Sequence, residues 1–191
     1  MYKTASLTGH RPGGFTPSQQ TILKEELVRV IHKLSPNVAI SGMAMGADMW
    51  WAETALYNDV PFHAYLPGID QTKGWVEEDK VLWGKLVDQA KEVYLAGVSE
   101  ILTPVPGAKK ARTSVMKREY SDHTVSTPAY HARNRAMVDN SDITVVCWNG
   151  HKGGTSTTFD YIRSINQPYI LIDFTVDPTK ATTTISKGSC E

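Results

Sequence analysis

The sequence lacks the features that mark several common classes of protein. Its 191 residues include two cysteines, Cys147 in an apolar run and Cys190 near the end, without the spacing of a disulfide framework or a zinc site. No apolar run approaches the roughly 20 residues that span a bilayer, and the first residues lack the apolar core of a signal peptide. We therefore expect a cytoplasmic protein with no membrane partner and no metal.

An excess of one charge and several standard catalytic motifs are absent as well. Lys plus Arg and Asp plus Glu number 20 each, so net charge gives no reason to expect a nucleic acid partner. The sequence contains neither GxGxxG nor GxxxxGK[ST], which argues against a dinucleotide dehydrogenase and a P-loop ATPase. It also has no GxSxG and no HExxH. No cofactor is predicted.

What the sequence does contain is a regular alternation of short apolar runs with helical patterns. This alternation predicts an α/β fold in which a doubly wound, mostly parallel sheet carries helices on both faces. The length favours a single domain, over residues 1–175. The expected strands are 4–8, 38–41, 62–66, 92–95, 143–147 and 169–174, and the expected helices begin at 16–17, 49, 81, 129 and 155.

Two segments break this alternation. Residues 97–128 show no clear periodicity and carry a cluster of Lys and Arg between Lys109 and Arg118, so we interpret them as a long loop or flap. Residues 176–191 are rich in Thr, Lys and Ser with little to bury, and we expect an extended or frayed tail.

A glycine-rich turn joins the second expected strand to the next helix. It reads Ser41-Gly42-Met43-Ala44-Met45-Gly46-Ala47-Asp48. Small residues at this junction let a ligand approach the backbone amides, and the N-terminus of a helix favours an anion. Asp48 is placed to bind a ribose hydroxyl or to complement the helix dipole. Tight packing of the helix on the sheet explains an isolated turn of this kind equally well.

A second turn of the same kind follows the run 143–147. Gly153 and Gly154 permit close approach of a ligand, and Thr155, Ser156 and Thr157 offer hydroxyl groups and amides to anionic oxygens. A helix cap is the alternative, but it needs fewer of these residues. With the turn at Gly9, three glycine-rich turns would face one crevice at the carboxyl ends of the strands.

Taken together, these motifs resemble the SLOG superfamily, and the YpsA-like branch most of all. The resemblance spans about residues 4–173 and rests on Thr8-Gly9-His10-Arg11-Pro12, the Ser41–Asp48 turn, the run His131–Met137, Asn140-Ser141-Asp142 and Gly153-Gly154-Thr155. The superfamily includes the LOG nucleotide phosphoribohydrolases, the DNA-processing protein DprA and nucleotide-sensing domains of bacterial defence systems. It implies a Rossmann-like fold, a ligand derived from a nucleotide, and plausible assembly into a homo-oligomer.

The LOG enzymes provide a specific comparison, because they pair an Arg from an R-K-x-x-M motif with a Glu from PGGxGTxxE. Arg133, four residues before Met137, matches the Arg, whereas Thr158 stands at the position of the Glu. A carboxylate is needed to stabilise the oxocarbenium-like transition state or to activate water. Asp48 or Glu53 would have to replace it, and Asp160 points to another side of its helix.

Three further side chains are candidates for the crevice. Arg11 is suited to a bidentate phosphate contact or to a surface salt bridge. His10 suits a phosphate contact, acid catalysis or one structural hydrogen bond. Trp148, just before the second turn, is our candidate among five tryptophans for stacking on a base.

Three functions follow from these observations. The first is binding of a nucleotide or nucleotide-derived metabolite, for sensing, sequestration or processing. The second is hydrolysis of an N-glycosidic bond, with Arg133 and Asp48 as catalytic residues. The third, single-stranded DNA binding as in DprA, finds support in Lys109, Lys110 and Arg112 but not in the net charge.

Overall fold

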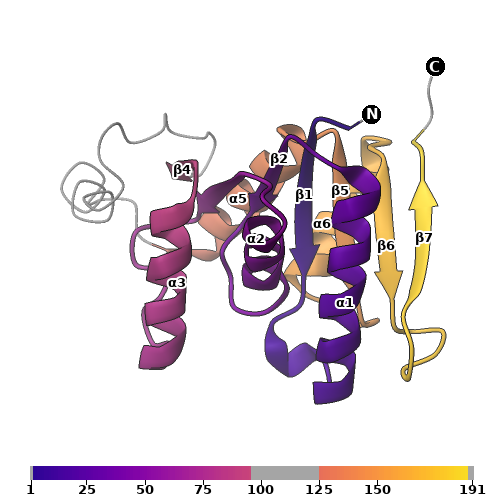
Figure 1. Ribbon diagram of the computed structural model, residues 1–191, viewed down its shortest axis with the longest axis horizontal. Coiled ribbons are helices and arrows are strands. Elements are labelled where there is room, and N and C mark those ends of the chain that lie inside the picture. The colour runs from indigo at the N-terminus through magenta and orange to yellow at the C-terminus, as the bar shows by residue number, and fades with distance from the viewer. Residues whose placement is uncertain (1, 96–124, 189–191) are drawn as a thin grey trace.

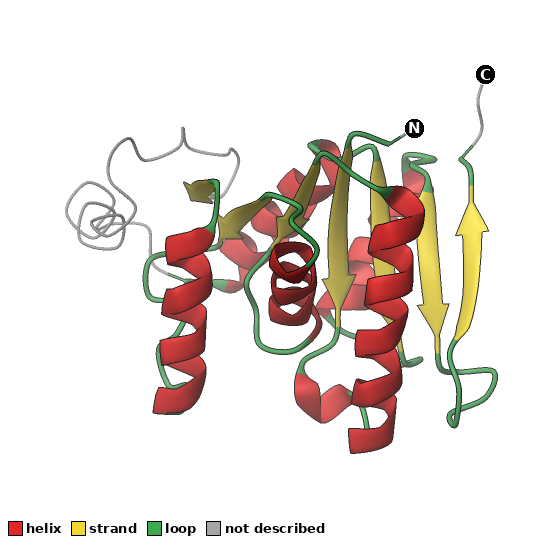
Figure 2. Ribbon diagram, viewed as in Figure 1, coloured by secondary structure: helices red, strands yellow, loops and turns green. Residues whose placement is uncertain are grey.

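A computed structural model describes residues 2–95 and 125–188, which form a seven-stranded sheet with helices on both faces (Figures 1 and 2). The strand order is β4-β3-β2-β1-β5-β6-β7, and every pairing is parallel except that of β6 with β7. The strands are β1 Thr4–Gly9, β2 Val38–Ser41, β3 Phe62–Leu66, β4 Glu92–Leu95, β5 Ile143–Trp148, β6 Tyr169–Asp173 and β7 Thr182–Ser186. The predicted α/β doubly wound fold is confirmed.

The helices divide between the two faces of the sheet, α1, α2 and α3 on one and α5 and α6 on the other (Figure 1). Their bounds are α1 Pro17–Leu34, α2 Ala47–Tyr57, α3 Glu77–Gln89, α5 Thr127–Asp139 and α6 Gly154–Ser164, with a short 3-10 helix η1 at Pro12–Gly14. Local sequence fixes the start of α1. Thr16 accepts a hydrogen bond from the amide of Gln19 and the Gln19 side chain accepts one from the amide of Thr16, which is a capping box.

The central strands are buried because helices cover both of their faces. Ile143, Val145, Val146 and Cys147 of β5 are fully buried, so this strand reads as a continuous apolar run and not as an alternating one. On the α1 side, Leu23, Leu27 and Ile31 lie one helical turn apart and pack onto the sheet, which gives the main core.

The structure differs from the sequence prediction mainly at the ends of elements. The segment after 176 was expected to be an extended or frayed tail, but Thr182–Ser186 is a strand, β7, paired antiparallel with β6. Its row of threonines suits a partly exposed edge strand, which periodicity in buried residues does not reveal. Helix α5 begins at Thr127, two residues before the predicted start, because Ser126 accepts a hydrogen bond from the amide of Ala129 and Pro128 is tolerated in the first turn.

Two sequence predictions lie partly or wholly outside the described residues. The predicted loop or flap at 97–128 is described only from 125, and Cys190 lies beyond 188. Within 2–95 and 125–188, none of the helices has the length and apolar character needed to cross a membrane.

Candidate functional site

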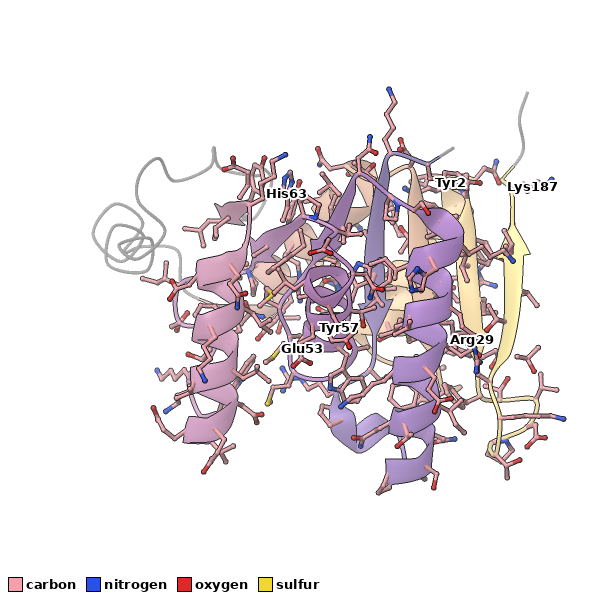
Figure 3. All side chains as sticks on the ribbon, in the orientation of Figure 1. Tyr2, Arg29, Glu53, Tyr57, His63 and Lys187 are labelled. Carbon is pink, nitrogen blue, oxygen red and sulfur yellow. The ribbon has the colours of Figure 1, made fainter. Side chains whose placement is uncertain are left out.

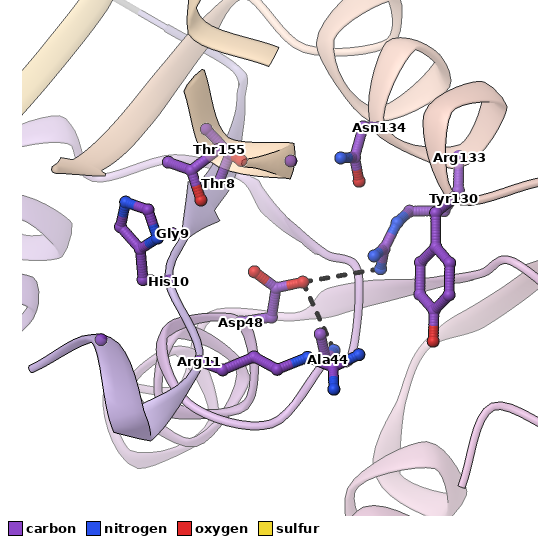
Figure 4. A pocket seen from close by; sticks show the side chains of 12 residues that line it. Thr8, Gly9, His10, Arg11, Ala44, Asp48, Tyr130, Arg133, Asn134 and Thr155 are labelled. Atoms are coloured by element: carbon purple, nitrogen blue, oxygen red, sulfur yellow. Dashed lines mark hydrogen bonds and ion pairs between the residues drawn. The ribbon is translucent and has the colours of Figure 1, made fainter. Parts of the chain in front are cut away.

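The strand order places a crevice between β1 and β5. The chain runs outward from β1 through β2, β3 and β4 on one side, and through β5 and β6 on the other, so the order of strands reverses between β1 and β5. Open α/β sheets bind ligands at the carboxyl ends of strands beside such a reversal. A pocket of about 380 Å³ lies there (Figure 4). Among its lining residues are Thr8, His10, Arg11, Asp48, Arg133 and Thr155.

A buried ion pair forms one wall of this pocket. Nη1 of Arg133 lies 3.5 Å from Oδ2 of Asp48, and the side chains are 4% and 8% exposed (Figure 4). The same carboxylate oxygen accepts a hydrogen bond of 3.3 Å from the amide of Ala44. Arg133 is held further by the carbonyl oxygens of Gly42 and Tyr65, to which Nη1 donates. Residues from α2 and α5 thus meet at the end of the sheet.

Burial shifts the ionisation of both members of the pair. It raises the pKa of Asp48, an effect that the charge of Arg133 and the amide of Ala44 oppose. It lowers the pKa of Arg133, which Asp48 opposes, and a guanidinium begins so high that it keeps its proton. The Nε atom of Arg133 is buried and has no hydrogen-bond partner within the described residues. Arg133 therefore keeps one buried donor that its pairing with Asp48 does not use.

At the glycines of the first turn and at Gly9, other atoms of the protein occupy the space that a side chain would need. A Cβ on Gly42 would lie 1.8 Å from Nη1 of Arg133, and a Cβ on Gly9 would lie 2.4 Å from that of Ala47. Gly46 has φ +90°, and a Cβ there would press on Pro12. Of the turn residues predicted to bind a nucleotide, the pocket is lined by Gly9 and Asp48, whereas Ser41, Gly42, Met43 and Gly46 are not among its lining residues.

Ser41 and Met43 support the turn from inside. Both are fully buried, and Met43 has φ +56°. The hydroxyl of Ser41 donates to the carbonyl oxygen of Asp48 at 2.7 Å and accepts from the amide of Met43 at 3.1 Å. These bonds hold the beginning of α2, and with it Asp48, in place.

The glycines of the second turn are different, because they face open space. A Cβ on Gly153 would meet nothing within 4 Å, and one on Gly154 would meet only Nδ2 of Asn134 at 4.0 Å. Helix α6 begins at Gly154, so the first amides of this helix have no partner inside it. Thr155 lines the first pocket with Gly154.

Ser156 and Thr157 line a second pocket, of about 810 Å³. Their hydroxyl groups also donate to the carbonyl oxygen of Gly153, at 2.8 and 3.1 Å. Trp148 lines this second pocket as well. Its ring lies 5.6 Å from that of His10 and 6.3 Å from that of Phe159.

His10 and Arg11 follow β1 and enter the first pocket from the side opposite Arg133 (Figure 4). Arg11 is exposed, and its charge acts on both Asp48 and Arg133. The Nε2 atom of His10 is buried without a partner among the described residues. Burial lowers the pKa of His10, and the charge of His151 lowers it further, so the ring is neutral at pH 7. These residues add one cation and one neutral imidazole.

Of the carboxylates considered as replacements for the missing Glu, one lines the pocket and the others do not. Asp48 lines the pocket. Glu53 lies on α2 (Figure 3), where the charge of Lys24 of α1 acts on it, and Asp160 pairs with Arg163. Thr158 is buried; its hydroxyl accepts a hydrogen bond of 3.0 Å from Asn134 and donates one of 2.8 Å to the carbonyl oxygen of Gly154. Asp48 is thus the one carboxylate among the residues that line this pocket.

Sequence reasoning missed two residues of α5 that line the pocket, Tyr130 and Asn134. The ring of Tyr130 lies 5.6 Å from the guanidinium carbon of Arg133. Arg133 and Asn134 lie three and four positions after Tyr130, so each is a neighbour of Tyr130 on the surface of the helix. That spacing was visible in the sequence once Arg133 had been chosen.

Comparisons with known proteins show which solved structures have a similar fold. No family model matches the chain, and no curated protein matches it. Among solved structures, DprA from Helicobacter pylori has a TM-score of 0.57 and 18% identity over 88% of this chain. DprA from Streptococcus pneumoniae has a TM-score of 0.57 and 16% identity over 90% of it. The chain shares the fold of these two structures.

A third solved structure with a similar fold is the molybdenum cofactor binding protein from Rippkaea orientalis. It has a TM-score of 0.52 and 15% identity, over 91% of this chain and 77% of its own. The chain spans 64% of the first DprA and 53% of the second, so what DprA does as a whole is not carried over. The YpsA-like branch stays a prediction, and so does the expectation that nucleic acid is an unlikely partner, which the likeness to DprA does not support.

Proposed function

We propose that this protein binds a nucleotide or nucleotide-derived metabolite in the pocket between β1 and β5. The observation that carries the proposal is the Asp48–Arg133 pair, which is buried and yet lines a pocket. Burying two charges costs free energy, because both are removed from water. A buried ion pair beside a crevice is therefore a candidate functional site.

The composition of the pocket supports an anionic ligand with hydroxyl groups. Arg11 and Arg133 bring two positive charges, and the free amides at the start of α6 add a partial one. Asp48 brings the opposing charge and, with one oxygen held by Arg133 and Ala44, keeps a second oxygen for a ribose hydroxyl. Phosphate and ribose in one molecule satisfy both features.

Calorimetry tests this proposal. The wild-type protein is titrated with AMP, GMP, UMP, ADP, ADP-ribose, a cyclic dinucleotide and a short single-stranded oligonucleotide. We expect saturable binding of at least one small nucleotide that Arg11→Ala weakens about tenfold, because a charged contact to phosphate is lost. Folded protein that binds nothing in this panel would refute the proposal, and binding of the oligonucleotide alone would replace it with DNA binding.

A second candidate function is hydrolysis of an N-glycosidic bond. The position of Asp48 favours it, because this is the one carboxylate among the residues that line the pocket. Asp48 would act on the ribose side of the bond, and Arg133 would hold Asp48 and the substrate. Thr158 cannot take part, since both of its hydrogen bonds are made inside the protein.

Chromatography of free base separates the two functions. Nucleoside monophosphates are incubated with wild-type protein and with Asp48→Asn. Base released by the wild type and lost in Asp48→Asn supports hydrolysis, whereas binding without release leaves a binding protein. Light scattering on the same samples tests the predicted homo-oligomer.

A further inference from the structure

The second pocket differs in character from the first. It has a volume of about 810 Å³ and lies at the start of α6, beyond Gly153. Its wall includes the rings of Trp148, which is half-buried, and Phe159. Arg163 also lines it, but this guanidinium is paired with Asp160 and lies 4.6 Å from the ring of Phe159. The pocket therefore combines aromatic surface with a paired guanidinium, and the exposed cation Lys152 lines it as well.

The aromatic rings that line the first pocket, His10 and Tyr130, have ring or cation neighbours, whereas Trp148 lines the second pocket and is half-buried although it also contacts His10. His10 packs against Phe15 and Trp148, with centroids 5.9 and 5.6 Å away, and Tyr130 packs against Arg133. The same pocket contains the free charge of Arg11 and the Asp48–Arg133 pair. A planar base thus finds its stacking surface in the second pocket, and an anionic group finds its partners in the first.

Gly154 lines both pockets, so the two meet at the first residue of α6. Neither Gly153 nor Gly154 is needed for packing, because both are exposed and a Cβ would meet no protein atom closer than 4.0 Å. Gly153 has extended backbone and Gly154 is helical, so neither position requires glycine for its conformation. Gly153 and Gly154 therefore place no side chain where the two pockets meet.

From this geometry we propose that one nucleotide spans both pockets, with its base on Trp148, its sugar over Gly153–Gly154 and its phosphate beside Arg11 and Thr155. This deepens the proposed function and rests on it. It adds a binding compartment for the base and makes Trp148 the residue that selects an aromatic group. It also makes Gly154 the residue whose lack of a side chain leaves room where the two pockets meet.

Gly154→Ala is the decisive variant, because alanine fits the fold there and even favours a helix. Its Cβ adds bulk where the two pockets meet, and the nearest atom that it approaches among the described residues is Nδ2 of Asn134, at 4.0 Å. Gly84→Ala is the matched control, since Gly84 lies in α3 and a Cβ there also meets nothing within 4 Å. Circular dichroism and thermal unfolding check that both variants remain folded.

Calorimetry with AMP, UMP and ribose 5-phosphate provides the readout. We expect Gly154→Ala to weaken AMP and UMP about tenfold while Gly84→Ala leaves them unchanged. We expect Trp148→Ala to weaken AMP about tenfold and more than UMP, because a purine offers the larger stacking face, and to leave ribose 5-phosphate within twofold.

The outcomes distinguish this inference from the function on which it rests. Wild-type protein that binds AMP, with Gly154→Ala and Trp148→Ala both unchanged, overturns the two-pocket site and leaves the proposed function standing. Loss of ribose 5-phosphate together with AMP in Trp148→Ala also overturns it, because the base would not be the group that Trp148 contacts. Wild-type protein that binds no nucleotide overturns both.

Discussion

The carbonyl oxygen of Gly42 accepts a hydrogen bond from Nη1 of Arg133, and the guanidinium occupies the space in which a Cβ of residue 42 would lie. The side chain of Arg133, from α5, therefore occupies the space that a side chain at residue 42 would need. Gln71 reaches the same carbonyl oxygen at 3.0 Å through Nε2. The first turn serves the pocket by holding Arg133 and Asp48.

Gly42→Ala should destabilise the fold by about 3 kcal/mol, because the new Cβ displaces a buried charge from its partners. Urea unfolding measures this free energy. Gly84→Ala serves as the control and should be neutral or stabilise by up to about 1 kcal/mol. Equal stability of wild type and Gly42→Ala would contradict the contact with Arg133.

A double-mutant cycle tests the buried ion pair. Asp48→Asn and Arg133→Met should each cost about 3 kcal/mol, since each leaves one polar partner unpaired away from water. The double variant should cost at least about 1 kcal/mol less than the sum. Additive costs in urea unfolding would show that the two side chains do not interact.

The free energy of unfolding of the Arg133→Met variant should depend more strongly on pH than that of the wild type. Burial raises the pKa of Asp48 in the folded state, so this group stabilises the fold below the ordinary pKa of Asp, about 4. That contribution is lost as the pH rises through the folded pKa, and without Arg133 the loss is larger. Urea unfolding between pH 4 and 8 should show Arg133→Met falling more steeply than wild type.

Asp142 should produce the opposite dependence at acid pH. Slight burial raises its pKa, but hydrogen bonds from the amides of Thr4 and Lys3, at 2.9 and 2.6 Å, bring it below its ordinary value. This group therefore stabilises the fold above about pH 4 and loses its effect as the pH falls through the lowered pKa. Asp142→Ala should lose less stability on acidification than wild type, with Asp88→Ala on exposed α3 surface as control.

The thiol of Cys147 should be inert in the folded protein. It is fully buried in β5, and burial together with the nearby charge of Asp48 raises its pKa. In a Cys190→Ser variant, modification by an aromatic disulfide reagent should proceed no faster than unfolding. Rapid reaction under native conditions would show that β5 is accessible.

The sequence was enough to predict the sheet because its strands are continuous apolar runs bounded by turns. The bounds of β2, β3 and β4 agree with those expected. The strand β7 was missed because three of its residues are exposed, so its sequence lacks the apolar pattern of a buried strand. It is held by its backbone pairing with β6.

The candidate site was predictable in its location and less so in its details. Gly-rich turns after three strands indicated the crevice, and Arg133 and Asp48 were both chosen. What the sequence could not supply was which atoms fill the space at each glycine. Gly42 and Gly154 look alike in sequence, yet one faces an arginine of the same chain and the other faces open space. That difference depends on α5, which is distant in sequence.

The β1–β5 pairing has a consequence for assembly of the pocket from separate parts of the chain. His10, Arg11 and Asp48 precede residue 95, whereas Arg133 and Thr155 follow residue 125. The pairing of Ala5–Gly9 with Ile143–Cys147 brings the two groups together. A proteolytic or recombinant fragment from either half lacks half of the site. A ligand that contacts both groups would stabilise the association of the two halves. The reassociation of two separate fragments would therefore report ligand binding.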